Sequence, residues 1–153
     1  MKKDIVAGLG EIGFPIYKII SKNSIVQGYD KNPDLIPKSK KNLESYSVRF
    51  LHICIPYNSK FIQNVIELNK KFLPESIVIH STIKPQTTKN IQKKLNIPII
   101  YSATRGVHRR MINDLKRYTK FFALDEKIPN SKSISRQYAN LMRKSGIKTK
   151  KMS

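Results

Sequence analysis

Short apolar runs alternate with longer mixed segments along the whole chain. The runs predict strands at 4–8, 24–29, 49–55, 76–80, 97–101 and 119–124, with a weak last strand near 147–151. The segments between them have helical length and predict helices at 11–22, 33–44, 58–71, 86–95, 109–116 and 131–145. Such alternation builds a mainly parallel sheet with helices on both faces. We therefore expect an α/β, doubly wound fold that occupies residues 1–153 as a single domain.

A glycine-rich loop separates the first predicted strand from the first predicted helix. Residues 8–13 read Gly-Leu-Gly-Glu-Ile-Gly, which is the spacing G-x-G-x-x-G. In a dinucleotide-binding unit of Rossmann type the first glycine allows a tight turn, the second admits the pyrophosphate and the third lets the helix pack closely. The helix N-terminus then faces the phosphates. We expect the cofactor to contact Gly8, Gly10, Glu11, Ile12 and Gly13.

An acid follows the second predicted strand. Asp30 lies seventeen residues after Gly13, where a carboxylate can accept hydrogen bonds from both hydroxyls of the adenosine ribose. The same carboxylate repels the 2′-phosphate of NADP, so the predicted cofactor is NAD. The alternative is that the glycines form a tight turn in a fold that has lost its cofactor.

Other strand exits are expected at the same edge, because ligands of such sheets bind at the carboxyl ends of the strands. The candidates there are Lys31, Pro56, Tyr57 and Thr82. For Thr82, contact with the nicotinamide end and helix capping are equally good interpretations, and Asn58 is a candidate N-cap as well as a candidate ligand.

The chain is strongly basic. It has 153 residues and a net charge of +20, from 30 Lys and Arg against 10 Asp and Glu. A field of this sign attracts polyanions, so nonspecific nucleic-acid binding is a possible partner interaction. The cations are dispersed along the predicted helices, and no aromatic and basic run resembles a base-stacking platform.

Length and composition exclude some classes of protein. No apolar stretch approaches the roughly 20 residues that span a bilayer. The start, Met1-Lys-Lys-Asp4, lacks the apolar core of a secretory signal, so a cytoplasmic location is expected. With a single cysteine, Cys54, and three histidines, a metal site has little support.

A few further residues invite a chemical interpretation. Cys54 lies inside an apolar run and is expected to be buried within a strand. His52 is expected to be a core histidine. Ser81, His80 and His108 suggest a nucleophile and base, yet no orienting acid is identifiable. Arg105 and His108 flank Gly106 and are candidates for anion binding or for ordinary surface loop positions.

Three segments together resemble the NAD-binding domain of the UDP-glucose/GDP-mannose dehydrogenase family, over roughly residues 4–150. They are the glycine loop 8–13, the strand Leu51-His-Ile-Cys-Ile-Pro56 and the segment Ser81-Thr-Ile-Lys-Pro-Gln-Thr-Thr88, which is similar to the family signature S-T-V-x-P-G-T-T. The resemblance implies an NAD-dependent oxidoreductase domain that uses hydride transfer to oxidise a nucleotide-sugar hydroxyl. The β-hydroxyacid dehydrogenases are similar through the same loop and are the competing family.

The departures from the family pattern concern catalysis. Gln86 replaces the usual glycine, and Ala103-Thr104 replaces the Pro-Glu of the family's S-P-E-R segment. The part that resembles the family does not include the substrate domain, which carries the catalytic cysteine and lysine. We therefore expect a cofactor half that is incomplete as a catalyst alone and is completed by a separate substrate-domain chain or by homo-oligomerisation. A stand-alone nucleotide-binding or regulatory module is the alternative, and a basic nucleic-acid-associated protein is a third.

Overall fold

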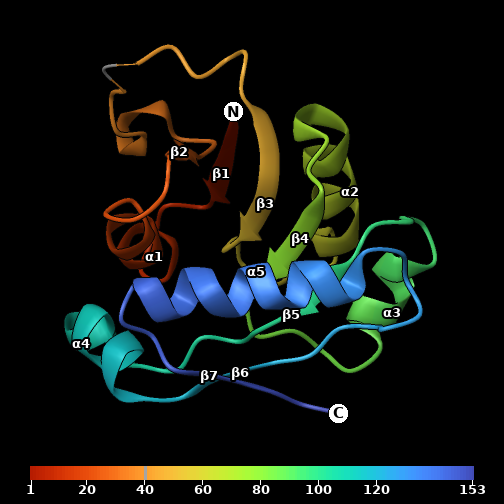
Figure 1. The fold of residues 1–153 in the computed structure, drawn as a ribbon. Helices are drawn as coiled ribbons and strands as arrows, with labels where there is room; N and C mark the ends of the chain where they lie inside the picture. The colour runs from red at the N-terminus through yellow and green to blue at the C-terminus, as the bar shows by residue number, and fades with distance from the viewer. Residues whose placement is uncertain (40) are drawn as a thin grey trace.

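The computed structural model describes residues 1–39 and 41–153, with their side chains except that of His108. Five parallel strands form the main sheet in the order β2-β1-β3-β4-β5 (Figure 1). They are β1 (Lys2–Ala7), β2 (Val26–Tyr29), β3 (Ser47–Ile53), β4 (Ser76–Ile79) and β5 (Ile99–Tyr101). Two further strands, β6 (Lys120–Phe122) and β7 (Thr149–Lys151), pair in parallel with each other. An antiparallel bridge from Tyr101 to Ala123 connects this pair to β5.

Helices cover both faces of the sheet. Alternate residues of each strand point to opposite faces, and apolar side chains on both faces pack against helices. Phe50 and Val78 face the layer that contains α1 (Gly13–Ile20), α4 (Met111–Arg117) and α5 (Ser131–Lys144). Leu51 and Ile77 face α2 (Phe61–Phe72) and α3 (Thr87–Gln92). Figure 1 shows α5 lying across the first of these faces. The expected α/β architecture with helices on both faces is confirmed.

The helix expected at 33–44 is wrong. Only a 3-10 turn, η1 (Pro33–Leu35), forms there, while Lys40 lies outside the described residues. Pro37 disfavours the helical conformation in the residue before it, and Ile36 is extended, with φ −80° and ψ 117°. Polar side chains then bond the local backbone, as where the Asn42 Oδ1 atom accepts from the N–H of Glu44 at 3.0 Å.

The strand order places a crevice beside β1. The chain places β2 next to one edge of β1 and then β3 next to its other edge. The loops that leave the carboxyl ends of β1 and β3 therefore diverge. A short 3-10 turn, η2 (His108–Arg110), directly precedes α4. None of the helices in the described residues has the length and apolarity required to cross a bilayer.

Candidate functional site

Two glycines of the loop after β1 are required by the packing of the protein itself. Gly8 has φ +92°, and a Cβ atom there would lie 2.8 Å from the carbonyl carbon and oxygen of Cys54. A Cβ atom on Gly13 would lie 1.6 Å from the Gly8 carbonyl oxygen. Any side chain at either position therefore collides with backbone, and the loop is held tightly against the exit of β3.

Gly10 differs from its two neighbours in the motif. It is exposed, and a Cβ atom there would meet no other protein atom within 4 Å. Packing therefore does not explain a glycine at this position, whereas close approach of a ligand to the backbone does. The open side of the loop lies at the start of α1, which has no acidic residue in its first turn and no side-chain cap. The partial positive charge of the helix N-terminus is available to an anion there.

Asp30 ties the end of β2 to the glycine loop. Its Oδ2 atom accepts a hydrogen bond from the N–H of Leu9 at 2.8 Å, and its Oδ1 atom accepts from the N–H of Asn32 at 2.9 Å. Each carboxylate oxygen has a second lone pair that can accept from a ribose hydroxyl. The acid thus has a structural task that its sequence position did not reveal.

A pocket of about 490 Å³ opens beside Asp30, between the exits of β1, β2 and β3. Its volume is sufficient for a nucleoside, and its walls combine apolar and charged groups. The lining residues that matter here are Gly8, Tyr29, Lys31, Pro56 and Lys71. The Lys71 ammonium lies 5.0 Å from the centre of the Tyr29 ring, so a cation and an aromatic face are held together at the pocket wall.

The remaining predicted site residues lie around this edge in different settings. Tyr57 is half-buried, with its hydroxyl 3.4 Å from the Thr87 Oγ1 atom, and does not line the pocket beside Asp30. Thr82 is exposed after β4. The capping interpretation of Thr82 is wrong for α3, since the N-cap residue of that helix is Gln86. The Asn58 Oδ1 atom accepts from the N–H of Lys60 at 2.9 Å, in the turn that leads into α2.

Gln86 occupies a backbone conformation that suits glycine. Its φ is +74°, in the left-handed region that costs residues with a side chain about 1–2 kcal/mol. The family pattern has a glycine here, so the substitution noted in the sequence leaves a strained turn at the entrance of α3.

Cys54 lies just outside β3, not within it as the sequence indicated, because the strand ends at Ile53. The residue is half-buried, and burial raises the pKa of its thiol to about 12. Such a thiol stays protonated at neutral pH and is a poor nucleophile.

Ser81 and His80, two of the residues that suggested a nucleophile and base, bond other partners than each other. The Ser81 hydroxyl donates to the Ile55 carbonyl at 2.5 Å, while the ring of His80 bonds His52. The side chain of His108 lies outside the part that the structure describes. The Arg105 guanidinium stacks 5.3 Å from the centre of the Tyr118 ring in an exposed loop, which agrees with the surface interpretation of this residue.

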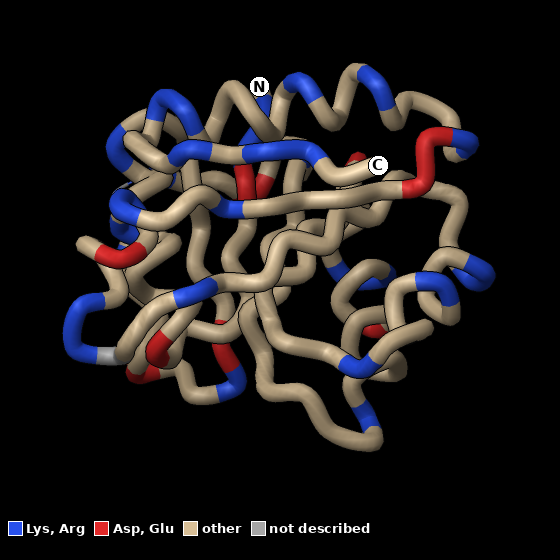
Figure 2. Tube along the Cα trace, turned by 90° about the horizontal axis from the view of Figure 1, so that it is seen from below, with Lys and Arg blue, Asp and Glu red and all other residues tan. Residues whose placement is uncertain are grey.

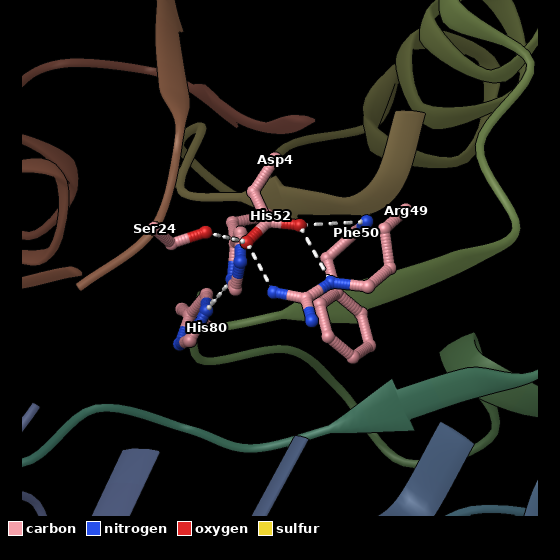
Figure 3. Close-up of polar contacts among 6 residues, drawn as sticks. All are labelled: Asp4, Ser24, Arg49, Phe50, His52 and His80. Carbon is pink, nitrogen blue, oxygen red and sulfur yellow. Dashed lines mark hydrogen bonds and ion pairs between the residues drawn. The ribbon is translucent and has the colours of Figure 1, made fainter. Parts of the chain in front are cut away.

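A buried polar cluster lies beneath the α5 face, and its pairings could not be predicted from the sequence (Figure 3). The Asp4 carboxylate accepts from the Arg49 Nη2 atom at 2.8 Å and from the Ser24 hydroxyl at 2.9 Å. The His52 Nδ1 and His80 Nε2 atoms are 2.9 Å apart. Both rings are fully buried, and desolvation lowers the pKa of His52 to about 4 and that of His80 well below its usual value. Both histidines are therefore neutral at pH 7.

Lys120 completes this buried layer. Its Nζ atom donates to the Ser102 carbonyl at 2.5 Å and to the Thr104 hydroxyl at 3.0 Å. Desolvation lowers its pKa to about 7. The Lys120 ammonium thus holds the loop after β5, in which Thr104 stands at the position of the family's acid. Only spatial proximity reveals this role, since the sequence separates these residues by a whole helix.

Comparisons with known proteins show what fold this chain has. No protein-family model matches the sequence, and no curated protein matches it. Solved structures do match. The UDP-D-ManNAc dehydrogenase of Pyrococcus horikoshii superposes with a TM-score of 0.77 at 16% identity, covering 98% of this chain and 46% of that chain. The UDP-N-acetyl-mannosamine dehydrogenase of Staphylococcus aureus gives a TM-score of 0.74 at 15% identity, covering 99% of this chain and 47% of that chain.

A third similar structure belongs to a different dehydrogenase. Prephenate dehydrogenase of Aquifex aeolicus, in complex with hydroxyphenyl propionate and NAD+, has a TM-score of 0.74 at 14% identity, covering 100% of this chain and 60% of that chain. At these identities the likeness establishes the fold. The chain spans about half the length of the two nucleotide-sugar dehydrogenases, whose family the sequence resemblance had indicated.

Proposed function

We propose that this chain binds NAD(H) at the carboxyl edge of its sheet and is the cofactor half of an oxidoreductase. The open side of Gly10 carries the proposal, because no protein atom within 4 Å requires a glycine there, whereas a pyrophosphate approaching the start of α1 does. The pocket of about 490 Å³ beside Asp30 supports an adenosine site next to it.

Each part of the cofactor has its own residues in this proposal. The pyrophosphate binds the backbone of the loop, the adenosine ribose binds at the end of β2, and the nicotinamide end extends toward the exits of β3 and β4. The residues are Gly8, Gly10, Glu11, Ile12 and Gly13 for the pyrophosphate, Asp30 and Lys31 for the ribose, and Pro56, Tyr57 and Thr82 for the remainder.

The neighbours that share the fold support a proposal for the reaction class. NAD, when bound, accepts a hydride at C4 of its nicotinamide, and the substrate we propose is the hydroxyl of a nucleotide sugar. This chain orients the cofactor, while substrate binding is supplied by a separate substrate-domain chain or by a second copy. The cytoplasmic location expected from the sequence remains a prediction that cell fractionation tests.

A second candidate is a nucleotide-binding or regulatory module without turnover. Two observations favour it. The Cys54 thiol has a pKa of about 12, and Thr104, at the position of the family's acid, is bonded to Lys120 at 3.0 Å. A cofactor domain of β-hydroxyacid dehydrogenase type is a further alternative within the same fold.

Titration of the purified chain with NADH, followed by nicotinamide fluorescence, tests the proposal. We expect saturable binding that is lost in Gly10→Val while the circular dichroism spectrum is retained. Absence of NADH binding by the wild-type chain would refute the proposal. Binding that persists in Gly10→Val would place the cofactor elsewhere on the molecule.

A further inference from the structure

The C-terminal part of the chain has an unusual charge distribution. No Asp or Glu occurs after Glu126, so α5, the turn after it and β7 carry cations only. Arginine is also concentrated late in the sequence. Only Arg49 precedes residue 105, whereas Arg105, Arg109, Arg110, Arg117, Arg136 and Arg143 follow. A general bias toward lysine does not account for this placement of arginine.

The fold gathers several of these cations around one groove. The groove lies between α5 and the start of β7, and its charged lining residues are Arg136, Arg143 and Lys148, all exposed. Asn140, between the two arginines on the same side of α5, accepts from the Arg143 Nη2 atom at 2.7 Å. Figure 2 shows Lys and Arg along α5 and along the C-terminal strand beside it.

Acidic side chains do not neutralise this groove. Among the ion pairs of the described residues, Lys151 is paired with Glu126 and Arg110 with Asp114, and none involves Arg136, Arg143 or Lys148. The groove shares no lining residue with the pocket beside Asp30. Its charge is therefore available to a second partner while the cofactor site is occupied.

We propose that this groove binds the phosphodiester backbone of duplex nucleic acid. Arg143 follows Arg136 by seven helical positions, which is about 10.5 Å along the axis, so the two guanidinium groups can contact different phosphates. Guanidinium groups suit phosphate through paired N–H donors. The groove has no aromatic lining residue, and Tyr138 of α5 is buried, so a stacking platform for single-stranded bases is lacking. Contacts with the nucleic-acid backbone alone do not discriminate between base sequences, so we expect binding without sequence specificity.

The test uses the full chain and a fluorescein-labelled duplex of mixed sequence, followed by fluorescence anisotropy. The variant Arg136→Glu/Arg143→Glu/Lys148→Glu reverses the groove, and Lys70→Glu/Lys93→Glu/Lys94→Glu changes the net charge equally on exposed positions in and near α2 and α3. We expect the groove variant to bind the duplex at least about tenfold more weakly than wild type. The slope of log K against the logarithm of the salt concentration should become shallower by about 0.9 for each phosphate contact that is removed. The control variant should lose much less.

Three results of the duplex and vesicle experiments would overturn the proposal. They are equal losses in the two variants, absence of duplex binding at about 50 mM salt, and binding to vesicles of phosphatidylserine and phosphatidylcholine without binding to the duplex. NADH titration of the groove variant separates this proposal from the cofactor function. Normal NADH binding together with lost duplex binding supports two independent sites, whereas loss of both would show that the variant is damaged as a whole and would refute an independent groove.

Discussion

The Asp30 carboxylate accepts a hydrogen bond from the backbone N–H of Leu9, with 2.8 Å between Oδ2 and N. The acid that we propose for the ribose therefore also holds the glycine loop against β2. Cofactor affinity and loop geometry depend on the same side chain. A substitution of Asp30 must be interpreted through both effects.

We predict that the chain binds NADH more tightly than NADPH, because Asp30 repels the 2′-phosphate. Asp30→Ala should weaken NADH binding by about tenfold or more, since hydrogen bonds to a charged group contribute about 1.5–3 kcal/mol. The same substitution should also reduce the difference in affinity between NADH and NADPH. Fluorescence titration with both cofactors measures this, with Glu75→Ala as a control for loss of an acid elsewhere. Comparable affinity of the wild type for NADH and NADPH would contradict the prediction.

Substitutions of Gly10 and Gly13 should have different effects. Gly10→Val is expected to abolish NADH binding and to leave the melting temperature nearly unchanged, because a Cβ atom at this position would meet no other protein atom within 4 Å. Gly13→Ala is expected to unfold or strongly destabilise the chain, because its Cβ would lie 1.6 Å from the Gly8 oxygen. Thermal melts by circular dichroism and NADH titration distinguish the two. Equal losses of stability would refute the assignment.

Gln86→Gly should stabilise the protein. The left-handed φ of +74° strains glutamine but suits glycine, so the free energy of unfolding should rise by about 1 kcal/mol. Gln63→Gly, on the exposed side of α2, should instead lower it by about 1 kcal/mol. Urea unfolding measures both. A lower free energy of unfolding in both variants would show that the backbone at residue 86 is not strained.

The stability contribution of Lys120 should depend on pH. Burial lowers its pKa from 10.5 to about 7, so the unfolded chain binds the extra proton between these values and wild-type stability rises with pH across that window. Below about pH 7 the charge is buried at full cost. The free energy of unfolding of Lys120→Met relative to wild type should therefore be highest at pH 6 and should fall by about 1.4 kcal/mol per pH unit above 7.

Urea unfolding at pH 6, 8 and 9 measures the difference between Lys120→Met and wild type. Lys116→Met, at an exposed position of α4, is the matched control and should show no such trend. A difference for Lys120→Met that stays constant with pH would mean that the lysine is charged throughout.

The isolated chain should not oxidise nucleotide sugars at a useful rate. The family that the sequence resembles uses a catalytic cysteine, which must react as a thiolate, and the only cysteine of this chain has a thiol pKa of about 12. NADH formation at 340 nm, measured with a panel of nucleotide sugars, should be at background for wild type and for Cys54→Ala alike. Substantial turnover that disappears in Cys54→Ala would show that this thiol is reactive.

Local patterns were sufficient for most elements and for the loop that we propose to bind the cofactor. The strands and most helices follow from apolar periodicity, and the glycine motif with Asp30 follows from fixed spacing. The segment 33–44 failed because Pro37 and local side-chain bonds override a weak helical pattern. The end of β3 at Ile53 also escaped prediction, since an apolar run does not reveal where strand pairing stops.

Tertiary structure alone decided which distant residues meet. Three features join segments that are separate in sequence. They are the contact of His52 with His80, the hydrogen bond from Lys120 to Thr104, and the groove between α5 and β7. Periodicity reports which face of an element is apolar, but it does not report which polar side chains face one another across the layers. Desolvation, which sets the pKa values of His52 and Lys120, arises from that packing. The sequence by itself therefore determined the fold and the loop proposed to bind the cofactor, and the packing of the layers determined the buried charges and the basic groove.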